Sequence, residues 1–103
     1  EDFHHQAGDS RTNCGVSNYN DLKNVQSCDL QGMPDLCTGC KHVQETVAAY
    51  INNMSQLGIA GFRVDAAKHM DPGELGALLK HVNSSLFWFL EVTAVPSEAV
   101  QTP

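Results

Sequence analysis

The sequence predicts an α/β fold in which two parallel strands are joined by a helix and preceded by a longer helix. Apolar residues recur at helical spacing over 40–57. Two short apolar stretches, 59–65 and 86–92, have the length and composition of buried parallel strands. A segment with helix-start signals, 71–82, lies between these stretches. The order helix, strand, helix, strand is typical of a right-handed crossover unit.

Residues 1–36, which precede these elements, are predicted to consist mainly of loops. The segment is rich in Gly, Asn, Asp and Ser and shows no sustained helical or strand periodicity. Short strand pairings fit this composition, but a layer of regular structure does not.

Both helices have recognisable ends. The first is expected to end at Gly58, because glycine readily adopts the left-handed conformation that follows many helices. The second begins with Asp71 as N-cap, Pro72 at the first helical position and Glu74 at the third, as in a capping box. The apolar residues at helical spacing are Val43, Val47, Tyr50, Ile51, Met54 and Leu57 in the first helix, and Leu75, Leu78, Leu79 and Val82 in the second.

Each predicted strand carries an acid near its end, Asp65 in the first and Glu91 in the second. Parallel strands joined by a crossover present their carboxyl ends at one sheet edge, so the two carboxylates should lie close together. Neighbouring strands lie about 4.8 Å apart, which allows the separation of about 5 to 5.5 Å that retaining glycosidases use. The alternative interpretation is that both acids are solvated strand ends without a catalytic role.

The surroundings of the two acids predict different roles for them. Two close carboxylates cannot both be ionised cheaply, so one of them should have a raised pKa. Glu91 follows the aromatic residues Trp88 and Phe89 and is therefore the expected proton donor. Arg63 points to the same side of its strand as Asp65 and can orient that carboxylate. The two aromatic side chains are expected to pack in the core rather than to stack on a sugar.

The composition argues against several other functions. The net charge is −6 and the six Lys and Arg residues are spread along the chain, so no nucleic-acid partner is expected. No apolar run approaches the roughly 20 residues that span a membrane, and the N-terminus does not resemble a signal peptide. Four cysteines, with sequons at Asn53 and Asn83, nevertheless indicate the oxidising route of a secreted protein.

Cys37 and Cys40 form a CxxC motif at the start of the first helix. Such a motif can be redox-active, because a helix N-terminus lowers the pKa of a thiol. The preceding residues, 33–36, make a poor core strand for a thioredoxin-type site, so a local disulfide is favoured. A zinc site built from cysteines and histidines is disfavoured, because a single CxxC motif matches no standard finger.

Three stretches of the sequence resemble a known family. Residues 61–69 read GFRVDAAKH and resemble the strand-four signature of the α-amylase family, glycoside hydrolase family 13. Residues 89–92 read FLEV and resemble its strand-five signature, while residues 18–36 resemble the end of its inserted domain. The resemblance favours the animal and actinobacterial type. It implies a partial (β/α)8 TIM barrel at 37–103, about strands four and five with flanking helices, after the loop-rich end of inserted domain B at 1–36.

The resemblance also implies roles for individual residues. Asp65 would be the nucleophile that forms a covalent glycosyl intermediate, Glu91 the general acid/base, and Arg63 the residue that orients Asp65. Lys68 and His69 resemble residues that contact the sugar on the leaving-group side. In chloride-dependent members, the residue that matches Arg63 also binds chloride. The implied reaction is retaining hydrolysis of α-1,4-glucosidic bonds in starch, glycogen and maltooligosaccharides.

Two further features are implied for the inserted domain and its junction with the barrel. One is a structural calcium ion whose ligands in this chain would be the Asp35 carboxylate and the backbone carbonyls of Gln26 and His69. These are the hard oxygen donors that calcium prefers, although three of them do not complete a site. The other is a disulfide between Cys14 and Cys28.

The chain departs from the family's pattern in its extent. Its 103 residues fall short of the roughly 250 of a complete barrel, and the signature that carries the family's third essential acid is absent. Open sheet edges and an uncovered apolar face should result. The chain is therefore expected to be a segment of a longer parent chain, or a truncated product stabilised by partners or self-association. The alternative function is a catalytically inactive carbohydrate-binding or interaction module.

Overall fold

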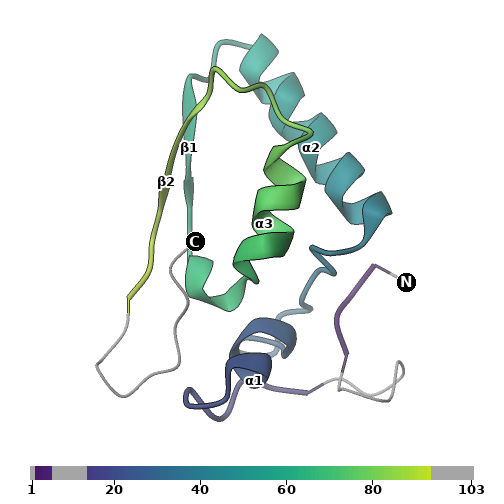
Figure 1. Cartoon of the computed structure of the whole chain (residues 1–103), viewed down its shortest axis with the longest axis vertical. Helices are drawn as coiled ribbons and strands as arrows, with labels where there is room; N and C mark the ends of the chain where they lie inside the picture. The colour runs from purple at the N-terminus through teal and green to yellow at the C-terminus, as the bar shows by residue number, and fades with distance from the viewer. Residues whose placement is uncertain (1, 6–13, 94–103) are drawn as a thin grey trace.

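The computed structural model of the chain describes residues 2–5 and 14–93. In chain order, the elements of this part are α1 (Leu22–Ser27), α2 (Lys41–Gln56), β1 (Gly61–Val64), the 3₁₀ helix η1 (Ala67–His69), α3 (Pro72–Leu79) and β2 (Phe87–Leu90). Figure 1 shows β1 and β2 side by side with α2 and α3 along one side of the pair, while α1 lies near the end at which both strands finish. The predicted order of helix, strand, helix and strand is confirmed.

The two strands form a parallel pair, as predicted. Each residue of β1 faces the residue at the same position of β2, beginning with Gly61 and Phe87. Both strands are shorter than the predicted stretches. Before Phe87 the chain turns back on itself, because the Leu86 N–H donates to the Asn83 carbonyl at 3.3 Å.

The core lies between the helices and one face of the strand pair. Its buried members are Ala48 and Ile51 of α2, Leu78 of α3, and Val82 and Leu86 between α3 and β2. Phe62 and Trp88 pack against this cluster from the strands, and their stacked rings have centroids 5.2 Å apart. The prediction that Trp88 belongs to the core is confirmed.

The opposite face of the strand pair carries exposed aromatic side chains. Phe87 is 67% exposed and Phe89 is 52% exposed, with ring centroids 6.1 Å apart. Because side chains alternate along a strand, these residues face away from the helices that bury Trp88. The expectation that Phe89 packs in the core is therefore wrong for this chain, whereas the predicted uncovered apolar face is present.

The longest described helix, α2, has the predicted extent but a narrower buried face. Gly58 follows it with the expected left-handed backbone, at φ +103°. Tyr50 and Leu57, which were expected to contribute to the apolar face, are 62% and 75% exposed, because α2 packs against α3 on one side only.

None of the described helices is both long and apolar enough to cross a membrane.

The start of α3 uses half of the expected capping box. The Asp71 carboxylate accepts hydrogen bonds from the N–H groups of Gly73 and Glu74 at 2.8 and 3.1 Å. The Glu74 carboxylate turns to the Thr38 hydroxyl, from which it accepts a hydrogen bond at 2.6 Å. Thr38 is buried, and a buried hydroxyl is stable only with such a partner. The tertiary contact therefore replaces the predicted local one.

The first half of the chain contains a short helix that the sequence analysis missed. The side chain of Asp21 caps α1 by accepting hydrogen bonds from the N–H groups of Lys23 and Asn24. With six residues, α1 is too short to show an apolar repeat. Isolated strand bridges join residues 3 and 36, 15 and 29, and 30 and 33, as the composition of the segment allowed.

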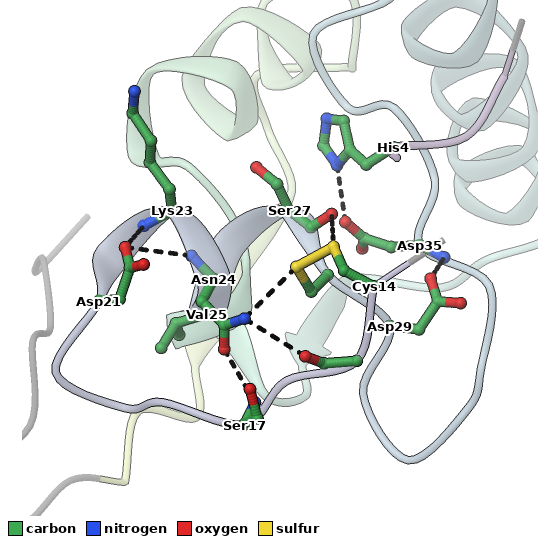
Figure 2. The surroundings of a disulfide bond; sticks show 12 residues. His4, Cys14, Ser17, Asp21, Lys23, Asn24, Val25, Ser27, Asp29 and Asp35 are labelled. Atoms are coloured by element: carbon green, nitrogen blue, oxygen red, sulfur yellow. Dashed lines mark hydrogen bonds and ion pairs between the residues drawn. A yellow bond between two sulfur atoms is a disulfide. The ribbon is translucent and has the colours of Figure 1, made fainter. Parts of the chain in front are cut away.

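Two disulfides join the described cysteines, Cys14 with Cys28 and Cys37 with Cys40. Both pairings agree with the predictions, the first from the family resemblance and the second from the CxxC spacing. Figure 2 shows the Cys14–Cys28 bond beside Asn24 of α1, whose side-chain amide lies 3.5 Å from the Cys28 sulfur. This disulfide therefore fixes the segment before α1 to the end of that helix.

Gly61 is required by the close approach of the two strands. A Cβ at this position would lie 2.5 Å from the Phe87 carbonyl oxygen, whereas a Cβ at Gly76 of α3 would meet nothing within 4 Å. We expect Gly61→Ala to lower the free energy of unfolding by about 1 to 3 kcal/mol, because the backbone must move. The matched change Gly76→Ala should raise it by about 0.5 to 1 kcal/mol. Urea unfolding measures both, and equal midpoints would contradict this interpretation.

Candidate active site

The register of the strands sets Asp65 and Glu91 at one edge of the sheet. The two acids directly follow Val64 and Leu90, which are the last paired residues of β1 and β2. The Glu91 N–H donates to the Val64 carbonyl at 2.9 Å, so the parallel ladder continues to the base of both acids. This is the juxtaposition that the crossover topology predicts.

Both oxygens of the Glu91 carboxylate accept hydrogen bonds. The Ala66 N–H donates to Oε2 at 2.9 Å, and the Thr93 hydroxyl donates to Oε1 at 2.5 Å. The backbone of Glu91 is also fixed, because its carbonyl accepts a hydrogen bond from the Ala67 N–H at 2.9 Å. The carboxylate is therefore held beside the backbone that follows Asp65.

The hydrogen bonds of Glu91 overturn one prediction about it. The Thr93 hydroxyl, followed by the Ala66 N–H, lowers the pKa of Glu91 below its ordinary value, and desolvation opposes this shift more weakly. The raised pKa that was expected from the preceding aromatic residues is therefore wrong for this structure. Trp88 packs toward the helices, so the nearest influences on the carboxyl are two donors that stabilise its charged form.

The Ala66 N–H reaches Glu91 through an unusual backbone conformation. Ala66 has φ 48° and ψ 40°, in the left-handed region, which costs a residue other than glycine about 1 to 2 kcal/mol. The next residue, Ala67, is fully buried and begins η1. Strained backbone of this kind is common where a functional site fixes the direction of a peptide group. Ala66 could not be predicted from the sequence, because only its peptide N–H takes part.

Arg63 contacts Asp65, as predicted from their positions on one strand. The guanidinium Nη1 donates to the Asp65 Oδ1 at 2.7 Å. The two side chains are 48% and 74% exposed, and such pairs contribute only about 0 to 1 kcal/mol to stability. The main effect of the pair is therefore to orient the Asp65 carboxylate.

Lys68 and His69 contact Tyr19, a residue of the first half that the sequence analysis did not single out. The Lys68 ammonium lies 4.7 Å from the centre of the Tyr19 ring and donates to the Thr93 carbonyl at 2.7 Å. The His69 ring packs edge-on against Tyr19, with ring centroids 5.9 Å apart. These contacts join the segment before α1 to the segment after β2. No local pattern identifies Tyr19, because its partners lie about fifty residues away in the chain.

Gln26 and His69, two of the predicted calcium ligands, lie at the contact between α1 and η1. The Gln26 side-chain amide donates to the Met70 carbonyl at 3.4 Å, and the His69 Nδ1 lies 2.9 Å from the Val25 carbonyl. The structure therefore brings the two residues whose backbone carbonyls were predicted to bind calcium into neighbouring segments.

Asp35, the third predicted ligand, has a partner that the sequence analysis did not foresee. Its Oδ2 lies 2.6 Å from the His4 Nδ1, and Figure 2 shows the two side chains turned toward each other. Burial raises the pKa of Asp35, and the hydrogen bond and charge of His4 oppose that shift. The other ring nitrogen of His4 lies 3.6 Å from the Glu74 Oε2. His4 thus links the N-terminal segment to Asp35 and to α3.

Within residues 2–5 and 14–93, no group of three or more His, Cys, Asp or Glu side chains is arranged to hold a metal ion. The predicted calcium ligands are of another kind, since they comprise one carboxylate and two backbone carbonyls. This all-oxygen donor chemistry fits calcium.

Comparison with known proteins gives α-amylases from several organisms. No protein-family model matches the chain. An α-amylase of Streptomyces violaceus is 45% identical over 86 residues, which cover 82% of this chain and 15% of the relative. An α-amylase of Tenebrio molitor is 41% identical over 105 residues, covering 91% and 22%. The crystal structure of α-amylase I from Eisenia fetida matches with a TM-score of 0.85 and 32% identity, covering 97% of this chain and 22% of that one.

A second solved structure is similar to the same degree. It is a mutant of the Eisenia fetida enzyme in complex with maltohexaose, which matches with a TM-score of 0.85 and 31% identity. The present chain spans only about a fifth of the length of the curated relatives and solved structures that it matches.

Proposed function

We propose that the longer protein to which this chain belongs is a retaining α-amylase, because the chain belongs to the α-amylase family and matches a segment of its members. Its substrates would be the α-1,4-glucosidic bonds of starch, glycogen and maltooligosaccharides. The observation that carries this proposal is the parallel register of β1 and β2, which sets Asp65 and Glu91 at one sheet edge. The maltohexaose bound to the Eisenia fetida enzyme supports an α-glucan substrate.

In this proposal β1 and β2 are strands four and five of a (β/α)8 barrel, and residues 37–103 form part of that barrel. Residues 1–36 form the end of inserted domain B. Active sites of such barrels lie at the carboxyl ends of the strands, where both acids stand here. The fold supports this assignment, because a parallel pair covered by α2 and α3 on one face corresponds to one sector of a barrel.

Each residue at the edge has a distinct task in the proposed reaction. Asp65, oriented by Arg63, attacks the anomeric carbon and forms the glycosyl ester, while Glu91 protonates the leaving oxygen. Glu91 then takes a proton from water, which hydrolyses the ester. Lys68 and His69 contact the sugar on the leaving-group side.

The hydrogen bonds of Glu91 favour the carboxylate form, which the second step needs. The first step needs the protonated form of the same group. We infer that bound sugar displaces water from the carboxyl and thereby raises its pKa, because desolvation disfavours the charged form. Substrate binding would then convert Glu91 from base to acid at the moment when an acid is required.

The proposed reaction is tested by incubating the full-length enzyme with maltooligosaccharides and following the products by proton NMR. We expect the α-anomer to appear first, as retention requires, and initial release of the β-anomer would exclude this mechanism. The isolated 103-residue chain is expected to show no turnover. The exposed Phe87 and Phe89 favour, for that chain alone, a second function as a non-catalytic interaction module. Starch hydrolysis by the isolated chain would rule that function out.

We also propose a structural calcium ion at the junction of residues 1–36 with the barrel. Asp35 would bind it through the oxygen that His4 does not contact, together with the backbone carbonyls of Gln26 and His69. When bound, the ion would hold α1 and η1 together and so keep Tyr19 beside Lys68. Arg63 would be this chain's contribution to a chloride site. The two disulfides support a secreted protein.

Removal of calcium is expected to lower the melting temperature of the full-length enzyme. An ion present at a hundredfold excess over its Kd stabilises the folded state by about 2.7 kcal/mol. Asp35→Asn should lower the melting temperature in calcium and abolish most of the further loss on adding a chelator. The control is Asp71→Asn, which makes the same charge change but keeps a good N-cap. If adding the chelator leaves the melting temperature of the unmodified enzyme unchanged, the calcium proposal is contradicted.

A further inference from the structure

Thr93 lies directly after β2 and contacts the site through both its side chain and its backbone. Its hydroxyl donates a hydrogen bond of 2.5 Å to the Glu91 Oε1, and its carbonyl accepts one of 2.7 Å from the Lys68 ammonium. Residues two positions apart in an extended chain point to the same side. The Thr93 hydroxyl is therefore directed at the carboxylate. The hydrogen bond between the Lys68 ammonium and the Thr93 carbonyl holds the chain after β2 in place.

We propose that Thr93 is a positioning residue that fixes the Glu91 carboxylate for the glycosidase reaction, an inference that rests on the proposed role of Glu91. The carboxylate has two oxygens, and the Ala66 N–H holds only Oε2. With Oε1 unbonded, the group could rotate about its last side-chain bond. The Thr93 hydroxyl removes that freedom and so keeps one oxygen of Glu91 in a fixed direction.

Lys68 holds the backbone of Thr93 through a hydrogen bond. Its ammonium is bonded to the Thr93 carbonyl and lies 4.7 Å from the centre of the Tyr19 ring. Three segments thus meet at Lys68: the segment before α1 through Tyr19, the η1 helix, and the chain after β2 through Thr93. The position of the hydroxyl consequently depends on residues far apart in the sequence.

The same hydroxyl influences the proton affinity of Glu91, because a donor to a carboxylate stabilises the charged form. The charged groups that act on Glu91 from the neighbouring elements are Arg63 of β1 and Lys68 of η1, both of which favour the carboxylate as well. Asp65 is the other acid at the edge. Loss of the hydroxyl alone should therefore raise the pKa of Glu91 and leave both cations in place.

The test uses Thr93→Val and Thr93→Ser in the full-length enzyme. Valine keeps the shape and the backbone carbonyl that binds Lys68 but lacks the hydroxyl, whereas serine keeps the hydroxyl. A general acid must be protonated, so a raised pKa moves the alkaline limb of the kcat/KM profile to higher pH. We expect a shift of about 0.5 to 1 pH unit for Thr93→Val, with a several-fold loss of kcat. Thr93→Ser should restore both values.

Two outcomes would overturn the inference. A Thr93→Val profile that superimposes on that of the unmodified enzyme would remove the positioning role, and an equal shift in Thr93→Ser would assign the effect to packing. Titration of the Glu91 carboxyl by carbon-13 NMR reads the same pKa even if turnover is slow. Glu91→Gln separates this inference from the proposed function: near-normal hydrolysis by that variant would remove the acid/base role itself. A large loss in Glu91→Gln beside an unchanged Thr93→Val would overturn only the role of Thr93.

Discussion

Asp65→Asn is expected to abolish hydrolysis by the full-length enzyme, with a loss on the order of 10⁴-fold or more in kcat. The asparagine amide has nearly the shape of the carboxylate but cannot form a stable glycosyl ester. Asp65 is 74% exposed, and its only described partner in an ion pair is Arg63. The substitution should therefore leave the fold intact, so a loss of activity reports on chemistry.

The Asp65→Asn experiment becomes decisive when two substrates are compared. The loss should be equally large for starch and for an aryl α-glucoside with an activated leaving group, because every substrate needs the nucleophile. The melting temperature serves as the control and should stay within a degree or two of the unmodified enzyme. Near-normal turnover of either substrate would remove the nucleophile assignment from Asp65.

Glu91→Gln is expected to have the second largest effect, with a loss of about 10² to 10⁴-fold on starch. Glutamine can still accept the hydrogen bond of the Ala66 N–H through its carbonyl oxygen, so the local structure should persist. It cannot donate a proton to the leaving oxygen. Formation of the glycosyl intermediate from an activated aryl glucoside needs no such proton and should therefore be nearly normal.

This contrast between substrates distinguishes the two acids. For Glu91→Gln and an activated substrate, the intermediate should accumulate as a burst of released phenol, because the missing base now slows the second step. Added azide, a nucleophile that needs no base, should restore turnover and yield a glycosyl azide. Equal losses on starch and on the activated substrate, without rescue by azide, would contradict the acid/base role of Glu91.

The elements that the sequence predicted well are those fixed by local chemistry. The left-handed Gly58 and the capping Asp71 mark the ends of helices through interactions within a few residues. The parallel pairing was predictable because crossover connections have one preferred hand. The position of Asp65 and Glu91 at one edge followed from that topology alone.

What the sequence could not predict depends on contacts between distant segments. The Glu74 carboxylate accepts a hydrogen bond from the buried Thr38 hydroxyl, 36 residues away in the chain. Asp35 is paired with His4, 31 residues away. The lowered pKa of Glu91 has such a cause only in part. The prediction considered the aromatic residues that precede Glu91 along the strand, whereas its carboxyl is governed first by the Thr93 hydroxyl, two residues further on, and then by the Ala66 N–H after the other strand.

The register of β1 and β2 limits where the chain can change its length. Because side chains alternate with a period of two, deleting Phe89 would turn either Trp88 out of the core or Glu91 away from the site. An insertion at 83–85, where all residues are exposed, would lengthen only the connection before the strand. Insertions and deletions among related sequences should therefore collect in that connection and spare β2.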